Sequence, residues 1–123
     1  MLQALTPMLW VDNVKDSIDY YVSVLGFRER NYVEDWGWGL VEKDGIKIMF
    51  ARPNDHTLYN GSQFTGSLYL RTDDVDACWE QLKNKATIYY GIENFEYGMR
   101  EFAIKDCNGY ILQFGEEISG LDK

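Results

Sequence analysis

The sequence predicts an α+β fold made of two copies of a βαβββ unit. Residues 11–14 (Val-Asp-Asn-Val) align with residues 72–75 (Thr-Asp-Asp-Val), and residues 44–50 align with residues 108–114. The first pair marks the end of a strand and the start of a helix, and the second pair marks a turn that leads into a strand. Because these signals follow in the same order in both halves, duplication explains them better than chance. We expect curled mixed sheets that form a central cup, with both helices outside.

The first half carries one helix between strands. Residues 5–11 alternate as a strand, and Asp12 and Asn13 are candidate helix N-caps. A helix follows, and Gly26 ends it as a left-handed residue. Apolar residues recur at helical spacing on one face of this helix, namely Val14, Ile18, Tyr21, Val22 and Leu25. Three strands are then predicted over residues 28–34, 36–42 and 46–51.

The second half repeats this plan after a polar connector. The connector covers residues 53–64, and a strand follows over residues 66–72. Asp73 and Asp74 cap a helix whose apolar face is Val75, Cys78, Trp79 and Leu82. A strand over residues 88–95 precedes a hairpin of residues 99–105 and 110–115, joined at an Asn-Gly turn.

Length and composition predict one small domain. We expect a single domain over residues 1–123, with repeat one at about 4–52, a loop at 53–64 and repeat two at about 65–117. The formal net charge of −8 argues against nucleic acid and anionic membranes as partners, and is compatible with a cationic ligand. No apolar run reaches membrane-spanning length, no signal peptide is visible, and the two cysteines form no metal motif. A cytoplasmic location is therefore predicted.

Three stretches together resemble a known superfamily. They are VDNVKDSIDYYVSVLGF (residues 11–27), LYLRTDDVDACWEQL (68–82) and YGMREFAIKDCNGYILQF (97–114). With residues 38–50 they cover nearly the whole chain and resemble the vicinal oxygen chelate superfamily of glyoxalases, extradiol dioxygenases and bleomycin-resistance proteins. Cys107 departs from the Pro that such families commonly have in this turn.

The resemblance implies a site in the cup. Metal-dependent members hold a divalent metal there with His and Glu from the first and last strands of each half. The corresponding residues here are Thr6, Met49, Ser67 and Gln113. Since none is a His or a carboxylate, we expect no metal and no other cofactor. The only histidine, His56, lies in the polar connector, where a solvated side chain is the simpler interpretation.

Strand alternation then assigns the side chains of the cup. To the positions that the resemblance implies, alternation adds Trp10, Tyr69 and Arg71. The resemblance to bleomycin-resistance proteins, in which aromatic residues near this point flank the drug, implies Trp38 as well. The candidate ligand-binding residues are therefore Trp10, Trp38, Met49, Ser67, Tyr69, Arg71 and Gln113. Trp36 and Trp38 are predicted on one face of their strand, separated by Gly37. Glu101 is predicted to face solvent or to pair on its strand, and no catalytic residue is assigned. The mixture of aromatic and polar side chains suits an organic ligand, although aromatic residues that fill the cup or a subunit interface would give the same pattern.

These features predict a metal-free homodimer that binds and sequesters a small aromatic or cationic molecule, as bleomycin-resistance proteins do. One alternative is a lyase or isomerase with a divalent metal or with acid/base work by Glu101. A second alternative is a dimerisation module whose cup is filled by its own side chains.

Overall fold

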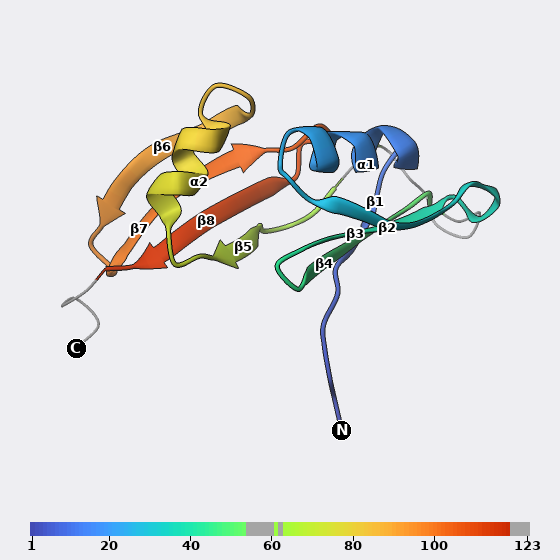
Figure 1. Cartoon of the computed structure of the whole chain (residues 1–123), viewed down its shortest axis with the longest axis horizontal. Coiled ribbons are helices and arrows are strands. Elements are labelled where there is room, and N and C mark those ends of the chain that lie inside the picture. The colour runs from blue at the N-terminus through green and yellow to red at the C-terminus, as the bar shows by residue number, and fades with distance from the viewer. Residues whose placement is uncertain (54–60, 62, 119–123) are drawn as a thin grey trace. The chain divides into compact units, whose positions relative to one another are not determined.

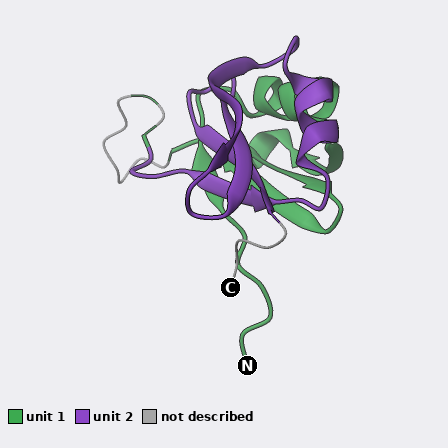
Figure 2. Ribbon diagram, turned by 90° about the vertical axis from the view of Figure 1, so that its left-hand side faces the viewer, with its two compact units in different colours: residues 1–63 green, residues 64–123 purple. Residues whose placement is uncertain are grey.

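The computed structural model describes residues 1–53, 61 and 63–118, and it divides the chain into two compact units. Unit 1 spans residues 1–63 and unit 2 spans residues 64–123 (Figure 2). Each unit contains a four-stranded mixed sheet and one α-helix (Figure 1). The α+β fold with a repeated βαβββ order is thereby confirmed.

Unit 1 follows the predicted order with one added turn. Its elements are β1 (Met8–Trp10), α1 (Val14–Ser23), β2 (Arg28–Val33), the 3-10 helix η1 (Glu34–Trp36), β3 (Trp38–Lys43) and β4 (Ile46–Ala51). The sheet order is β1-β4-β3-β2, with β1 parallel to β4 and the other pairs antiparallel.

Unit 2 repeats this topology without the 3-10 helix. Its elements are β5 (Leu68–Arg71), α2 (Val75–Leu82), β6 (Thr87–Phe95), β7 (Met99–Lys105) and β8 (Ile111–Glu117). The sheet order β5-β8-β7-β6 matches that of unit 1 strand for strand. The same backbone hydrogen bond closes the first strand of each unit, from Val11 N to Ala51 O at 3.0 Å and from Thr72 N to Gly115 O at 2.9 Å.

Both helices start where the sequence predicts. The Asn13 side chain accepts a hydrogen bond from Asp16 N at 2.9 Å, and the Asp74 side chain accepts one from Ala77 N at 3.1 Å. These side chains satisfy backbone donors that have no partner within the helix. Gly26 takes a positive φ of 80° just beyond α1, as a residue without a Cβ does readily.

Each unit packs its helix against one face of its own sheet. In unit 1 the fully buried residues include Ile18 of α1, Val41 of β3 and Phe50 of β4. In unit 2 the Trp79 ring of α2 lies 5.2 Å from the Phe102 ring of β7, measured between centroids. Residues one position along each strand therefore lie on the opposite face, which in each unit is the face away from the helix.

The prediction that Trp36 and Trp38 share a strand face is wrong. Trp36 lies in η1 with 74% of its surface exposed, whereas Trp38 begins β3. Between them Gly37 takes a left-handed backbone with φ 60° and ψ 48°, which interrupts the extended chain. The sequence pattern missed this turn because Gly37 was interpreted as a small strand residue, when its use is to allow the left-handed conformation.

Candidate functional site

The face of unit 2 away from α2 contains a fully buried carboxylate. Glu101 lies in β7, has 0% of its surface exposed, and sits in register with Gly115 of β8. Of the two environments predicted for Glu101, solvent or a partner on its strand, exposure to solvent is wrong. A charged side chain is rarely buried without partners, because removal from water costs several kcal/mol unless hydrogen bonds replace the lost hydration.

Side chains from β5, β6 and β8, and from the residue before β5, are linked to Glu101 directly or through Gln113. The Tyr69 hydroxyl donates to Glu101 Oε1 at 2.6 Å, and the Tyr90 hydroxyl donates to Glu101 Oε2. Gln113 Nε2 lies 2.8 Å from the Tyr90 oxygen and 3.3 Å from Glu101 Oε2, and the Ser67 hydroxyl donates to Gln113 Oε1. We refer to Ser67, Tyr69, Tyr90, Glu101 and Gln113 as the Glu101 cluster.

The hydrogen bonds hold Glu101 in its ionised form. Burial by itself raises the pKa of the carboxyl, but hydrogen bonds from Tyr69, Tyr90, Tyr97 and Gln113 outweigh burial and lower the pKa below its ordinary value of 4.5. Burial and the neighbouring carboxylate raise the pKa of Tyr90 to about 12 and that of Tyr69 further. At neutral pH the cluster is thus one anion surrounded by protonated donors.

An aromatic surface adjoins the cluster. The Tyr97 ring, 61% exposed, stacks on the Phe95 ring with 5.4 Å between centroids and 10° between planes. Phe95 in turn meets the Tyr90 ring edge-on at 5.7 Å. Tyr97, Phe95 and Tyr90 therefore form a continuous aromatic surface that leads to the buried carboxylate.

The structure brings three of the four predicted site residues of unit 2 together. Ser67, Tyr69 and Gln113 belong to the Glu101 cluster, whereas the Arg71 guanidinium pairs with Glu117 at 3.1 Å. Arg71 and Glu101 both lie in register with Gly115, so they share a sheet face, but no hydrogen bond joins Arg71 to the cluster among the contacts of the described residues.

The three predicted residues of unit 1 lie on one face of its sheet. Trp10 and Trp38 are both in register with Ala51, two positions from Met49 on β4. All three side chains are partly exposed, while the alternate positions Leu9, Ile48 and Phe50 are buried under α1. The face away from α1 is therefore apolar and aromatic, in contrast to the polar cluster of unit 2.

Sequence reasoning missed Tyr90, Tyr97 and the role of Glu101. Glu101 could have been found by counting back from the Asn-Gly turn, since this places Glu101 opposite Gly115 and hence on the same face as Gln113. Tyr90 could not, because the pairing of β6 with β7 shifts register on both sides of it.

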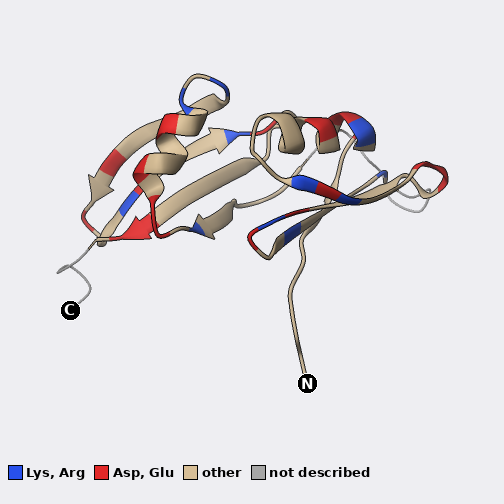
Figure 3. Cartoon of the chain, in the orientation of Figure 1, with Lys and Arg blue, Asp and Glu red and all other residues tan. Residues whose placement is uncertain are grey.

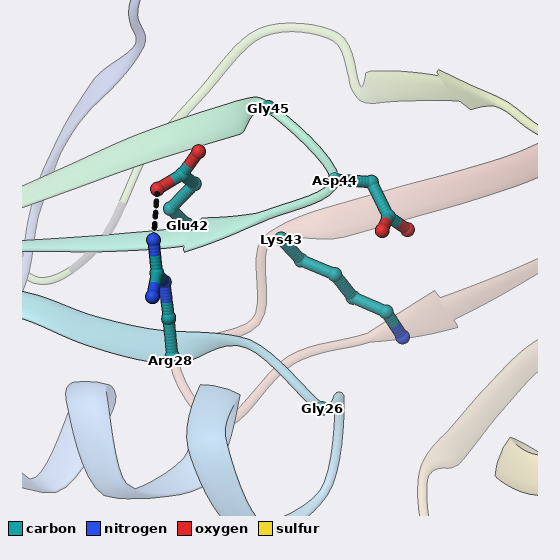
Figure 4. Close-up of a pocket in the computed structure, with 6 residues that line it drawn as sticks. All are labelled: Gly26, Arg28, Glu42, Lys43, Asp44 and Gly45. Carbon is teal, nitrogen blue, oxygen red and sulfur yellow. Dashed lines mark hydrogen bonds and ion pairs between the residues drawn. The ribbon is translucent and has the colours of Figure 1, made fainter.

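One pocket of about 310 Å³ lies elsewhere, in unit 1. Figure 4 shows its lining residues: Gly26, Arg28, Glu42, Lys43, Asp44 and Gly45. Its cationic groups already have partners, since Arg28 contacts Glu42 at 3.3 Å and Lys43 Nζ donates to the Leu25 carbonyl at 3.2 Å. The Glu101 cluster is the stronger candidate because it contains a buried charge.

A family model decides the relationship of this chain to known proteins. The model described as "Glyoxalase/Bleomycin resistance protein/Dioxygenase superfamily" matches residues 3–114. The chain belongs to this superfamily.

Several solved structures have the same fold as this chain. A member from Sphaerobacter thermophilus is 22% identical and superposes with a TM-score of 0.78, covering 95% of this chain and 98% of that one. A glyoxalase/bleomycin resistance protein/dioxygenase from Nocardioides is 13% identical, with a TM-score of 0.78 over 98% and 87% of the two chains. TioX from Micromonospora sp. ML1 is 18% identical, with a TM-score of 0.75 over 94% and 99%. At these identities the likeness concerns the fold alone, and no curated protein matches the sequence.

The glyoxalase-superfamily positions that hold a metal do not suit one in unit 2. Gln113 Oε1, the amide oxygen at one of these positions, accepts a hydrogen bond from Ser67, and the amide nitrogen faces Glu101 and Tyr90. Neutral hydroxyl and amide groups are weak ligands for the transition metals that bind His and Glu. Within residues 1–53, 61 and 63–118, no three His, Cys, Asp or Glu side chains gather where they could hold a metal ion.

Two further predictions concern His56 and membrane-spanning helices. His56 lies outside the described residues. Neither helix in the described part of the chain is long and apolar enough to cross a bilayer.

Proposed function

We propose that this glyoxalase-superfamily chain binds a small aromatic or cationic organic molecule without metal and without turnover. The observation that supports the proposal is the buried, ionised Glu101 held by Tyr69, Tyr90 and Gln113 beside an exposed aromatic surface. A fixed negative charge next to aromatic rings favours cationic and aromatic ligands. The acidic net charge favours the approach of a cation as well.

The predicted residues take complementary roles in this proposal. In unit 2, Ser67, Tyr69 and Gln113 would orient the polar part of a ligand bound there. In unit 1, Trp10, Trp38 and Met49 stay candidates for stacking or apolar contact. Arg71, paired with Glu117, would attract anions less than its charge alone suggests, because the pair is neutral.

An enzyme with Glu101 as general base is the alternative. A general base works best with a pKa near the operating pH and with a free lone pair aimed at the substrate. Glu101 has a lowered pKa, and both of its oxygens already accept hydrogen bonds from tyrosines. These properties favour a role in holding the site over a role in proton transfer. A lyase or isomerase that uses a divalent metal is the remaining form of the alternative, and metal content separates it from the proposal.

The test combines elemental analysis with a ligand titration. Purified protein is first analysed for transition metals and is then titrated with a metal-free bleomycin-type glycopeptide by calorimetry and tryptophan fluorescence. We expect saturable binding near one ligand per chain, less than a tenth of an equivalent of metal, and weaker binding by Tyr69→Phe. Stoichiometric metal together with an absence of binding would contradict the proposal and support the enzyme.

We also propose that the chain forms a homodimer in a cytoplasmic setting. A dimer interface would cover large apolar side chains that are exposed in the single chain, such as Met8, Trp36 and Ile46. Light scattering coupled to gel filtration measures the mass directly, and a monomer at 100 μM would contradict the dimer.

A further inference from the structure

The hydroxyl protons of the Glu101 cluster all point inward. An ionised carboxylate accepts hydrogen bonds and donates none, so the Tyr69 and Tyr90 hydroxyls must direct their protons at Glu101. Each phenol has only one proton to donate. Their oxygens therefore have no proton left for a ligand and can only accept.

The amide of Gln113 has one possible orientation. Its Nε2 faces the Tyr90 oxygen at 2.8 Å and Glu101 Oε2 at 3.3 Å, so the nitrogen supplies protons to two acceptors. The opposite orientation would set the amide oxygen against the carboxylate oxygen and would leave the Ser67 hydroxyl facing an NH₂ group. Ser67 consequently also donates inward, to Gln113 Oε1.

A ligand on this face of unit 2 thus meets acceptors and π-surfaces. Tyr69 is 42% exposed as a residue and offers its ring, while its hydroxyl oxygen keeps lone pairs that can only accept. Tyr97 is more exposed still and offers a ring stacked on Phe95. Both features attract positive charge, and neither can donate a proton to an anion while Glu101 is ionised.

The charged residues near the cluster also favour a cationic ligand over an anionic one. Two basic groups of the sheet are paired with carboxylates, Arg71 with Glu117 at 3.1 Å and Arg100 with Asp76 at 2.9 Å. Lys105, on the same strand as Glu101, lies over the Tyr89 ring at 5.2 Å from its centroid. Figure 3 shows further acidic residues on β6, on α2 and at the end of β8. Glu101 itself has no cationic partner among the ion pairs of the described residues, and its charge is balanced by dipoles alone.

We infer that the ligand of the proposed function is an organic cation with N–H donors, such as a primary ammonium or a guanidinium, attached to an aromatic or apolar body. The N–H groups satisfy the outward lone pairs of Tyr69, the charge interacts with Glu101, and the body rests on the Tyr97 and Phe95 rings. Carboxylates and phosphates are rejected because they meet only acceptors and negative charge. This inference rests on the proposed function and narrows its ligand class.

Four probes of nearly the same shape test the inference by calorimetry at pH 7. They are 2-phenylethylammonium, its N,N,N-trimethyl analogue, 3-phenylpropanol and 3-phenylpropanoate. We expect the primary ammonium to bind at least tenfold more tightly than each of the others. In Glu101→Gln this preference should fall to threefold or less, whereas Glu80→Gln, an exposed residue of α2 with the same change of charge, should keep it.

Each other result overturns the inference in a recognisable way. Equal binding of the trimethyl analogue would show that charge and rings suffice and that N–H donors are not selected. If the alcohol or the carboxylate binds most tightly, the ligand is not a cation, although the chain still binds small molecules. If no probe binds at 10 mM, the inference fails, and the glycopeptide titration decides separately whether the proposed function fails with it. Melting curves of both variants establish that they are folded.

Discussion

The Tyr69 ring lies directly over Gly115, and this contact depends on the missing side chain of the glycine. A Cβ at residue 115 would lie 2.8 Å from Tyr69 Cζ and closer still to the hydroxyl oxygen. Gly115 is also in register with Glu101 on the neighbouring strand, so the space above it is the space through which Tyr69 reaches the carboxylate. Unit 1 has Ala51 at the position equivalent to Gly115, where β1 and β3 both pair with β4.

Gly115→Ala should therefore displace Tyr69 from Glu101. We expect the free energy of unfolding to fall by about 1–3 kcal/mol, because a hydrogen bond to a charged group is lost. Urea denaturation measures this value. Gly91→Ala is the matched control, since a Cβ there meets its nearest atom, in Trp79, at an ordinary 3.8 Å. Equal stability losses in the two variants would show that Tyr69 does not need the space above Gly115 to reach Glu101.

Glu101→Gln should destabilise the fold by about 2–3 kcal/mol at pH 7. The amide that replaces the carboxylate has one acceptor oxygen for the donors that now share two, and its NH₂ group faces a donor. Glu101 has a lowered pKa, so its contribution is present above the ordinary value of 4.5 and is lost as the pH falls through the folded-state value. The difference between wild type and variant should hence shrink in acid. A constant difference from pH 7 to pH 2 would contradict this.

Tyr69 and Tyr90 should ionise later than most of the nine tyrosines. Burial and Glu101 raise the pKa of both, to about 12 for Tyr90. A raised folded-state pKa contributes stability that is complete below the ordinary value of 10 and is lost as the pH rises through the folded-state value. We expect unfolding to begin between pH 10 and 12, observed by circular dichroism beside tyrosinate absorbance. In Tyr69→Phe one late-ionising group should disappear; an unchanged titration would refute the assignment.

Asp74→Ala should cost about 1 kcal/mol of stability. The Asp74 carboxylate caps α2 through the hydrogen bond from Ala77 N at 3.1 Å, and this donor has no partner within the helix. The neighbouring Asp73→Ala removes the same charge without removing the cap. Thermal or urea unfolding should separate the two variants, and similar losses in both would mean that charge, not capping, stabilises this end of α2.

Periodicity and turn chemistry were enough to predict most of the fold. The strands Ile46–Ala51 and Met99–Lys105 and the helix Val75–Leu82 have the bounds that the patterns indicate. Helix caps and the Asn108-Gly109 turn depend on residues that are close together in the sequence, so the sequence alone is enough to predict them. Gly37 shows the limit, because the same residue type serves a strand or a left-handed turn according to the backbone around it.

The site was predictable only in part. The resemblance to the superfamily implied Ser67 and Gln113, strand alternation added Tyr69, and the structure joins the three in one network. Glu101 was set aside because exposed glutamates are the common case, and only its partners make burial tolerable. Those partners come from β5, β6 and β8, and the β6 partner depends on a shift of register that alternation does not predict.

The most direct test of the account is a titration of the Glu101 carboxyl carbon by NMR, with Glu101→Gln used for assignment. The account requires an ionised carboxylate that anchors a binding site, so the midpoint should lie below the ordinary value of 4.5 and the carboxyl should remain charged at every physiological pH. A midpoint of 6 or higher would contradict it, because such a carboxyl exchanges protons near neutral pH and would be suited to acid/base catalysis.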